Sequence, residues 1–216
     1  MRESPRMRRL RTDRKALEQL RTESTILDFS APHTLRDNPA ESYSVHFRGK
    51  GLWRPNGSND VLIREIHEVS IQLGAAYPRM MPELTWQTPI FHPNISGSGI
   101  VCLGGYGTHW VPSLNLDELC VMLWDIVRYA NLDVESPYNR EAALWAKTQD
   151  LYRLPVDPRP LRDRLAGLAP PDGDRKPPIT TLPHPVAPDD MTFLDEDGIV
   201  DAEVVEPEDP DILFIE

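Results

Sequence analysis

The chain has 216 residues, 22 prolines, two cysteines and a formal net charge of −11. Two cysteines in a chain of this length do not make a disulfide scaffold and fit a reducing compartment. No apolar run is long enough to span a membrane, and the arginine-rich N-terminal segment is not followed by the apolar core of a signal peptide. We therefore expect a cytoplasmic protein that makes no membrane contact.

The C-terminal part of the chain differs in composition from the rest. Twelve of the 22 prolines lie at or beyond Pro155, and no sustained apolar periodicity accompanies them. Residues 189–216 contain twelve Asp or Glu and no Lys or Arg, so this segment carries more than the whole net charge. We predict a domain over residues 1–154 and a Pro-rich, then acidic, disordered tail over residues 155–216.

The first half of the predicted domain reads as one helix followed by strands. Residues 8–21 place leucines on one helical side and basic residues mainly elsewhere, which predicts an amphipathic, basic helix. Strand-like stretches follow, separated by turns rich in Pro, Asn and Gly, near residues 25–29, 43–47, 61–73 and 84–86. Consecutive strands without intervening helices predict an antiparallel meander.

The second half begins with the turn-rich residues 89–112. Apolar residues at three-four spacing then predict a central buried helix: Leu116, Leu119, Leu123, Ile126 and Val127. A further helix is predicted after Pro137. The predicted fold class is α+β, with an N-terminal helix, a four-stranded antiparallel meander, a loop-rich segment, a central helix and C-terminal helices.

The candidate catalytic residues lie between His92 and Cys102. A cysteine thiolate is a strong nucleophile, and a thioester keeps an acyl group reactive toward a later amine. Glycines before Cys102, and the loop Gly104–Gly107 after it, would let a bulky acyl donor approach the backbone. The Asn94 carboxamide can donate a hydrogen bond to the oxyanion that forms when an amine attacks. The alternative for a lone cysteine is a small core residue, which is what the helical pattern predicts for Cys120.

Four sequence elements follow one another in a recognisable order: Tyr77-Pro78 with Pro82, His92-Pro93-Asn94, the Gly-Ile-Val approach to Cys102, and Trp110 with Pro112. This set resembles the ubiquitin-conjugating (E2) family over about residues 8–152. The resemblance implies the E2 (UBC) fold. It also implies that Cys102 accepts a ubiquitin-like protein as a thioester from an activating enzyme (E1) and transfers it to a lysine.

The resemblance also implies roles around the cysteine, and no cofactor. His92 and Pro93 would form the structural site turn together with Trp110 and Pro112, and Asn94 would stabilise the oxyanion or support the loop. A general-base role for His92 is disfavoured, because in this family the histidine packs and hydrogen-bonds within the turn.

One departure from the family concerns the acid near the attacking lysine. Many members carry an Asp before the proline that opens the helix after the site, but here Ser136 precedes Pro137. The chain is also about two residues longer between Cys102 and that proline. Asp133 or Glu135 could supply the carboxylate that favours proton loss from the lysine. The alternative is that both are solvated loop charges.

Partner predictions rest on the first helix and on the Tyr-Pro loop. In E2 proteins a basic first helix meets an acidic surface of E1, and the residues placed to do so are Arg8, Arg9, Arg11, Arg14 and Lys15. Nucleic-acid binding is disfavoured, because the chain is acidic and the sheet shows no stacking motif. Arg79 stands where the family commonly has an aromatic residue that inserts into RING-type ligases, so we expect an unusual ligase (E3) or none. These departures indicate a divergent member, such as one from a bacterial ubiquitin-like pathway.

Two other functions stay open. A non-catalytic E2-like module would bind a ubiquitin-like protein or organise a conjugation complex, although inactive relatives characteristically lack the cysteine found here at Cys102. A thiol hydrolase would need His92 within hydrogen-bond reach of Cys102. The histidines lack metal-ligand spacing, so no metal site is predicted. No phosphate-binding loop is present, so ATP must be used on another protein.

Overall fold

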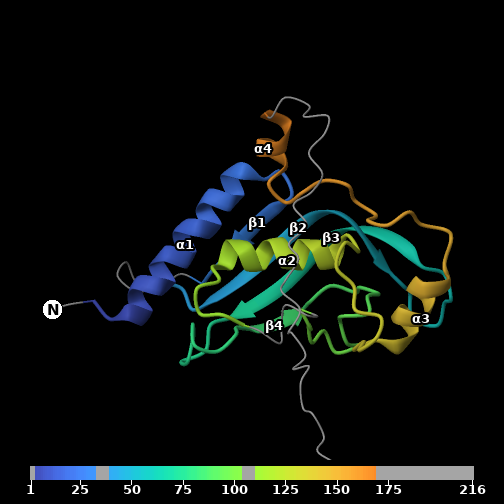
Figure 1. The fold of residues 1–216 in the computed structure, drawn as a ribbon, viewed down its shortest axis with the longest axis horizontal. Helices are drawn as coiled ribbons and strands as arrows, with labels where there is room; N and C mark the ends of the chain where they lie inside the picture. Colours follow the sequence, from blue (N-terminus) through green and yellow to red (C-terminus); the bar gives the residue numbers. More distant parts are fainter. Residues whose placement is uncertain (1–2, 33–38, 104–109, 169–216) are drawn as a thin grey trace, which may run out of the picture. The chain divides into compact units, whose positions relative to one another are not determined.

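The computed structural model describes residues 3–32, 39–103 and 110–168 (Figure 1). Their elements follow in the order α1 (Pro5–Glu23), β1 (Leu27–Ser30), β2 (Ser42–Trp53), β3 (Leu62–Gln72), β4 (Glu83–Trp86), α2 (Leu116–Val127), α3 (Arg140–Thr148) and α4 (Asp163–Leu168). The predicted succession of a helix, four strands and further helices is confirmed. The glycine loop after Cys102 and the acidic tail lie outside the described residues. Within the described ranges no helix is long and apolar enough to cross a membrane.

The sheet is the predicted antiparallel meander, with neighbouring strands in the order β1-β2-β3-β4. Along β2 the side chains of Tyr43, Val45 and Phe47 are buried, and the residues between them are only partly so. This period of two places one face of the sheet on the core. Strand β2 runs further than predicted, because its pairing with β3 continues as far as Trp53 and Leu62 past a shift in register between Arg48 and Gly51.

Helix α2 packs against the buried face of the sheet (Figure 1). All five apolar residues that predicted this helix are fully buried. Trp124, also fully buried, stacks on Phe47 with ring centroids 6.0 Å apart, and Phe47 stacks in turn on Trp86 at 6.4 Å. The three aromatic rings join the helix to strands β2 and β4.

Helix α1 begins before the predicted start. The Ser4 hydroxyl accepts a hydrogen bond from the Met7 amide at 3.2 Å, and Pro5 occupies the first helical turn. A serine N-cap followed by proline is a favourable helix start, because the cap satisfies a free amide and proline has none to satisfy.

One buried carboxylate ties α1 to three other segments. Asp13 accepts hydrogen bonds from Arg9 Nε at 2.8 Å, from the Tyr77 hydroxyl at 2.6 Å and from the Leu116 amide at 3.2 Å. The Arg9 guanidinium also donates to the carbonyl oxygens of Pro112 and Leu114. The first helix, the Tyr-Pro loop, the Trp-x-Pro turn and the start of α2 therefore meet at one ion pair.

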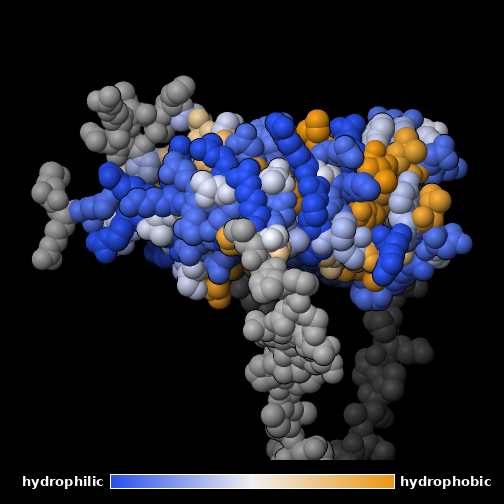
Figure 2. All heavy atoms as spheres, turned by 90° about the horizontal axis from the view of Figure 1, so that it is seen from above, coloured by the Kyte–Doolittle hydropathy of each residue, from blue (hydrophilic) through white to orange (hydrophobic). Residues whose placement is uncertain are grey.

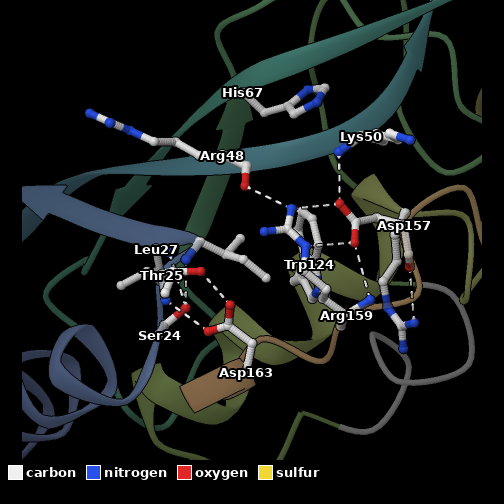
Figure 3. Close-up of polar contacts among 12 residues, drawn as sticks. Ser24, Thr25, Leu27, Arg48, Lys50, His67, Trp124, Asp157, Arg159 and Asp163 are labelled. Atoms are coloured by element: carbon white, nitrogen blue, oxygen red, sulfur yellow. Dashed lines mark hydrogen bonds and ion pairs between the residues drawn. The ribbon is translucent and has the colours of Figure 1, made fainter. Parts of the chain in front are cut away.

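The packed chain continues past the predicted domain boundary, a difference shown in Figure 3. Asp157 is almost fully buried and accepts hydrogen bonds from the Lys50 amide at 3.0 Å and from Arg159 Nη2 at 2.7 Å. Burial raises the pKa of Asp157, but the hydrogen bonds from Arg159 and Lys50 outweigh it and lower the pKa to about 2. The Trp124 indole donates to the Arg159 carbonyl at 2.8 Å. These contacts place residues 155–168 against the domain.

The same segment also reaches the end of α1. The Thr25 amide donates to the Asp163 carboxylate at 2.7 Å. Arg162 pairs with Asp117 of α2 at 2.6 Å and with Glu23 of α1. The segment supplies partners for polar groups elsewhere in the domain, a role that no local sequence pattern predicts.

Candidate functional site

The His-Pro-Asn turn is organised around a buried, neutral histidine. His92 is fully buried, its Nδ1 accepts a hydrogen bond from the Asn94 amide at 3.0 Å, and its ring meets Tyr129 edge to face with centroids 4.4 Å apart. Burial lowers the pKa of His92 to about 3. A neutral ring whose Nδ1 is already engaged suits a structural role and gives no support to a Cys102–His92 dyad.

The two cysteines occupy opposite environments. Cys102 is partly exposed, and its backbone amide donates to the Asn94 carbonyl at 2.8 Å. Cys120 is fully buried in α2, and burial raises the pKa of its thiol. Because the thiolate is the reactive form, Cys102 is the cysteine that can act as a nucleophile and Cys120 is inert.

A tight turn leads the chain to Cys102. Ile95 pairs with Val101, and the Ser96 amide donates to the Ile100 carbonyl at 2.9 Å. Gly99 has a φ of 84°, and a Cβ placed there would lie 2.3 Å from the Trp86 carbonyl oxygen. Only glycine allows this close approach, so the glycine-rich run passes close to β4 just before Cys102, with Ile100 paired to Thr85.

The Asn94 carboxamide is buried, and only its oxygen has a hydrogen-bond partner among the described residues. Only 1% of the residue is exposed, and its Oδ1 accepts a hydrogen bond from the Asp133 amide at 2.7 Å. Among the described residues, no acceptor pairs with its Nδ2. The side chain therefore supports the loop through its oxygen and retains a donor for another group.

The two acid candidates, Asp133 and Glu135, and Ser136 at the position where many members carry an Asp lie on one loop, in different surroundings. Asp133 Oδ1 accepts hydrogen bonds from the amides of Glu135 at 3.0 Å and Ser136 at 2.9 Å. The Glu135 carboxylate, 84% exposed, pairs with Lys147 at 2.8 Å. Ser136 is exposed. Asp133, whose amide contacts Asn94, is therefore also the residue whose carboxylate holds the loop.

The far end of this loop is also fixed to the His-Pro-Asn turn. The Pro93 carbonyl accepts hydrogen bonds from the amides of Tyr138 at 2.9 Å and Asn139 at 3.0 Å. Asn139 then caps α3 by accepting from the Ala142 amide at 3.1 Å. This second attachment was not predicted from the sequence, although an Asn followed by Arg-Glu-Ala-Ala is a recognisable helix start.

The Trp-x-Pro turn contacts the Tyr-Pro loop. Trp110 Nε1 donates to the Pro78 carbonyl at 2.7 Å, and the Trp110 ring lies 6.2 Å from that of Tyr77. Pro112 contacts α1 through the Arg9 guanidinium. The structure therefore gives Trp110 and Pro112 a connecting role between the site turns and the first helix.

The basic residues of α1 do not form one uniform surface. Arg8, Arg11 and Lys15 are exposed, and hydrophilic side chains cover the α1 end of the molecule in Figure 2. Arg14 pairs with Glu18 at 2.7 Å. The Arg9 side chain is only 14% exposed and serves the Asp13 ion pair. Arg9 is therefore removed from the predicted E1-binding set, because its guanidinium is engaged inside the domain.

A second buried histidine lies in β3. His67 is fully buried, and its Nε2 lies 2.9 Å from the Arg64 carbonyl oxygen. Burial lowers the pKa of His67 to about 4. In the described part of the chain, no three His, Cys, Asp or Glu side chains gather where they could hold a metal ion.

We expect the domain to lose stability as the pH falls from about 6.5 toward 4. Below about 6.5 the unfolded chain protonates both histidines, whereas folded His67 and His92 stay neutral, so the unfolded state binds more protons. Each histidine then lowers the free energy of unfolding by up to about 1.4 kcal/mol per pH unit. Urea denaturation across this range measures the slope. His67→Gln should flatten it, and an equal slope in wild type and variant would contradict the prediction.

The architecture now defines a class of protein. An N-terminal helix, a four-stranded meander and a central helix surround a His-Pro-Asn turn beside an accessible cysteine, which is the UBC fold. The solved structure of Ubc12 from S. cerevisiae matches 69% of this chain and 75% of its own with a TM-score of 0.52. At 21% sequence identity that match concerns the fold alone.

Sequence comparison finds similarity to one family over part of the chain. Residues 57–157 match the profile of the family described as "Ubiquitin-conjugating enzyme". "Ubiquitin-conjugating enzyme E2 16" of Schizosaccharomyces pombe is 36% identical over 83 residues, covering 38% of this chain and 51% of that protein. "Probable NEDD8-conjugating enzyme Ubc12-like" of Arabidopsis thaliana is 31% identical over 102 residues, covering 41% and 54%. "SUMO-conjugating enzyme UBC9" of Caenorhabditis elegans is 32% identical over 68 residues, covering 31% and 40%.

Over residues 57–157, just under half of the chain, the domain is similar in sequence to ubiquitin-conjugating enzymes, and its fold is the UBC fold. The chain spans about half the length of the first two of these curated relatives, and less of the third.

Proposed function

We propose that this chain is an E2-type acyltransferase with Cys102 as the acyl carrier. The Cys102 thiolate attacks the thioester carbon of a ubiquitin-like protein on E1, a new C–S bond forms, and the E1 cysteine leaves as its thiolate. A lysine amine then attacks the Cys102 thioester. The C–N bond forms, the C–S bond breaks, Cys102 is regenerated, and the amine proton goes to solvent.

The observation that carries this proposal is the backbone hydrogen bond that joins partly exposed Cys102 to Asn94, whose side chain is a buried donor. Cys102 is bonded through its backbone to Asn94, whose Nδ2 has no partner among the described residues. A donor held in a dry site before reaction is well suited to stabilise an oxyanion. The alternative, a non-catalytic module that recognises a ubiquitin-like protein, would need neither the accessible thiol nor this donor.

The names of the relatives supply the class of cargo and partner. They are described as ubiquitin-, NEDD8- and SUMO-conjugating enzymes, so we propose a ubiquitin-like protein as cargo and an E1 as its donor. Arg8, Arg11, Arg14 and Lys15 are the proposed E1 contacts. Exposed Arg79 supports an unusual E3 or none. A cytoplasmic location, a bacterial pathway and the division of the chain into domain and tail remain predictions.

The test is a thioester assay on the full chain. Ubiquitin, NEDD8 and SUMO are each supplied with their own E1 and ATP, and the products are separated on gels with and without reductant. We expect a reductant-sensitive adduct with one of them, absent in Cys102→Ala and retained in Cys120→Ala, the matched control for loss of a thiol. Adducts absent throughout, with every E1 demonstrably loaded, would favour the binding module.

A further inference from the structure

The loop that carries the acid candidates is folded by its own aspartate. Asp133 contributes two groups at once: its backbone amide donates to Asn94 Oδ1, and its carboxylate accepts from the amides of Glu135 and Ser136. We propose that Asp133 is a positioning residue that orients the Asn94 carboxamide for oxyanion stabilisation, and that it acts by accepting hydrogen bonds. The inference rests on the acyl-transfer function proposed above.

The first step concerns the orientation of the carboxamide. An Asn side chain can exchange its oxygen and nitrogen by rotating about its last bond, and the two ends differ chemically. The Asp133 amide can only donate, so it selects the oxygen at a distance of 2.7 Å. The nitrogen is thereby turned to the other end, where no described residue competes for it.

The second step concerns how the Asp133 amide is held in place. The loop is attached to the His-Pro-Asn turn at Asp133 and again at Tyr138 and Asn139, through the Pro93 carbonyl. Between these attachments, Glu135 and Ser136 are exposed and Val134 and Pro137 are only partly buried, and the Glu135 carboxylate pairs with Lys147 at the surface. The two bonds to Asp133 Oδ1 fix the backbone at the start of this stretch, in the manner of an Asx turn.

The third step separates this role from that of an acid. An Asx turn needs an acceptor oxygen and no charge, and Asn forms it as well as Asp does. A carboxylate that assists a lysine ammonium must be negative. Asp133→Asn keeps the acceptor and removes the charge, whereas Asp133→Ala removes both, so the two variants distinguish the roles.

The experiment bypasses E1. Cys102 of the full chain is acylated by thiol exchange with the 2-mercaptoethanesulfonate thioester of ubiquitin, and the purified conjugate is chased with free L-lysine at several pH values. We expect Asp133→Asn to match wild type in rate and pH profile. Asp133→Ala should transfer between about ten- and a hundredfold more slowly, as for a displaced catalytic group. Asp150→Ala, which removes an exposed aspartate past α3, is the control.

Two outcomes would overturn the proposal. Equal slowing in Asp133→Asn and Asp133→Ala, with a changed pH profile, would show that the charge is needed. Wild-type transfer by Asp133→Ala would show that the turn has no role in the reaction. Failure of wild-type Cys102 to accept the acyl group or to pass it to lysine would count instead against the proposed function.

A spectroscopic measurement tests the orientation without any reaction. The side-chain amide resonances of Asn94 in the ¹⁵N-labelled protein are assigned by their loss in Asn94→Ala. We expect Asp133→Ala to shift or broaden them and Asp133→Asn to leave them in place. Unchanged Asn94 resonances in Asp133→Ala would overturn the inference whatever the state of Cys102.

Discussion

Asn94→Ala is expected to slow transfer from the Cys102 thioester to lysine by about 100- to 1,000-fold, the usual effect of removing one oxyanion donor. The reason is that Asn94 Nδ2 is a buried donor with no partner among the described residues, on a residue whose backbone carbonyl accepts from the Cys102 amide. Single-turnover chase of the preformed thioester measures the rate, separately from the rate at which Cys102 is loaded.

A matched variant separates the donor from the loop support. Asn94→Ala also leaves the Asp133 amide without its acceptor, which by itself would loosen the loop. Asn94→Asp keeps an oxygen for the Asp133 amide but replaces the Nδ2 donor by a second oxygen. At about pH 8.5 we expect this variant to be slow as well. Wild-type transfer by Asn94→Asp would limit Asn94 to holding the loop.

Asp13→Ala is expected to lower the free energy of unfolding by about 3–5 kcal/mol, the cost of leaving a buried charge without its partner. Asp13 is fully buried and satisfies Arg9, the Tyr77 hydroxyl and the Leu116 amide. Its removal leaves Arg9, whose side chain is only 14% exposed, without its carboxylate counter-ion. Equilibrium urea denaturation of the full chain measures the change.

Two control variants should lower the free energy of unfolding by less than Asp13→Ala does. Tyr77→Phe removes one of its hydrogen bonds and should cost about 1–3 kcal/mol, because Asp13 keeps its other partners. Glu18→Ala breaks the half-exposed pair with Arg14 on the same helix and should cost less than about 1 kcal/mol. A change as small for Asp13→Ala as for Glu18→Ala would mean that the buried ion pair does not hold α1 in place.

Local patterns predicted the elements well because each is decided by nearby residues. The three-four spacing of Leu116, Leu119 and Leu123 specifies a buried helix face wherever that helix packs. The strand predicted near residues 43–47 was too short, because β2 continues to Trp53. Its pairing with β3 goes on past a shift in register between Arg48 and Gly51, where the alternation of buried and exposed residues breaks down.

In the candidate site, too, local features could be predicted from the sequence and contacts between distant residues could not. The spacing of His92, Asn94 and Cys102 is a property of one turn and its approach, so it could be read from the chain. The contact between Asn94 and Asp133 joins residues 39 positions apart, and no local pattern indicates which backbone amide will meet a carboxamide. From the sequence, Asp133 was considered for its negative charge. In the structure, its carboxylate oxygen accepts two backbone hydrogen bonds within its own loop.

By itself, the sequence determined the order of elements, and it predicted Cys102 as the nucleophile and the turn beside it, since these depend on residue type and local spacing. Only the tertiary structure decided which charges are buried. Arg9, predicted to lie at the surface, pairs with buried Asp13. Asp157, in a segment that composition assigned to the tail, accepts a hydrogen bond from the Lys50 amide. Burial and hydrogen bonding between distant segments depend on how the whole chain packs, and a polar residue becomes structural only when packing removes its water.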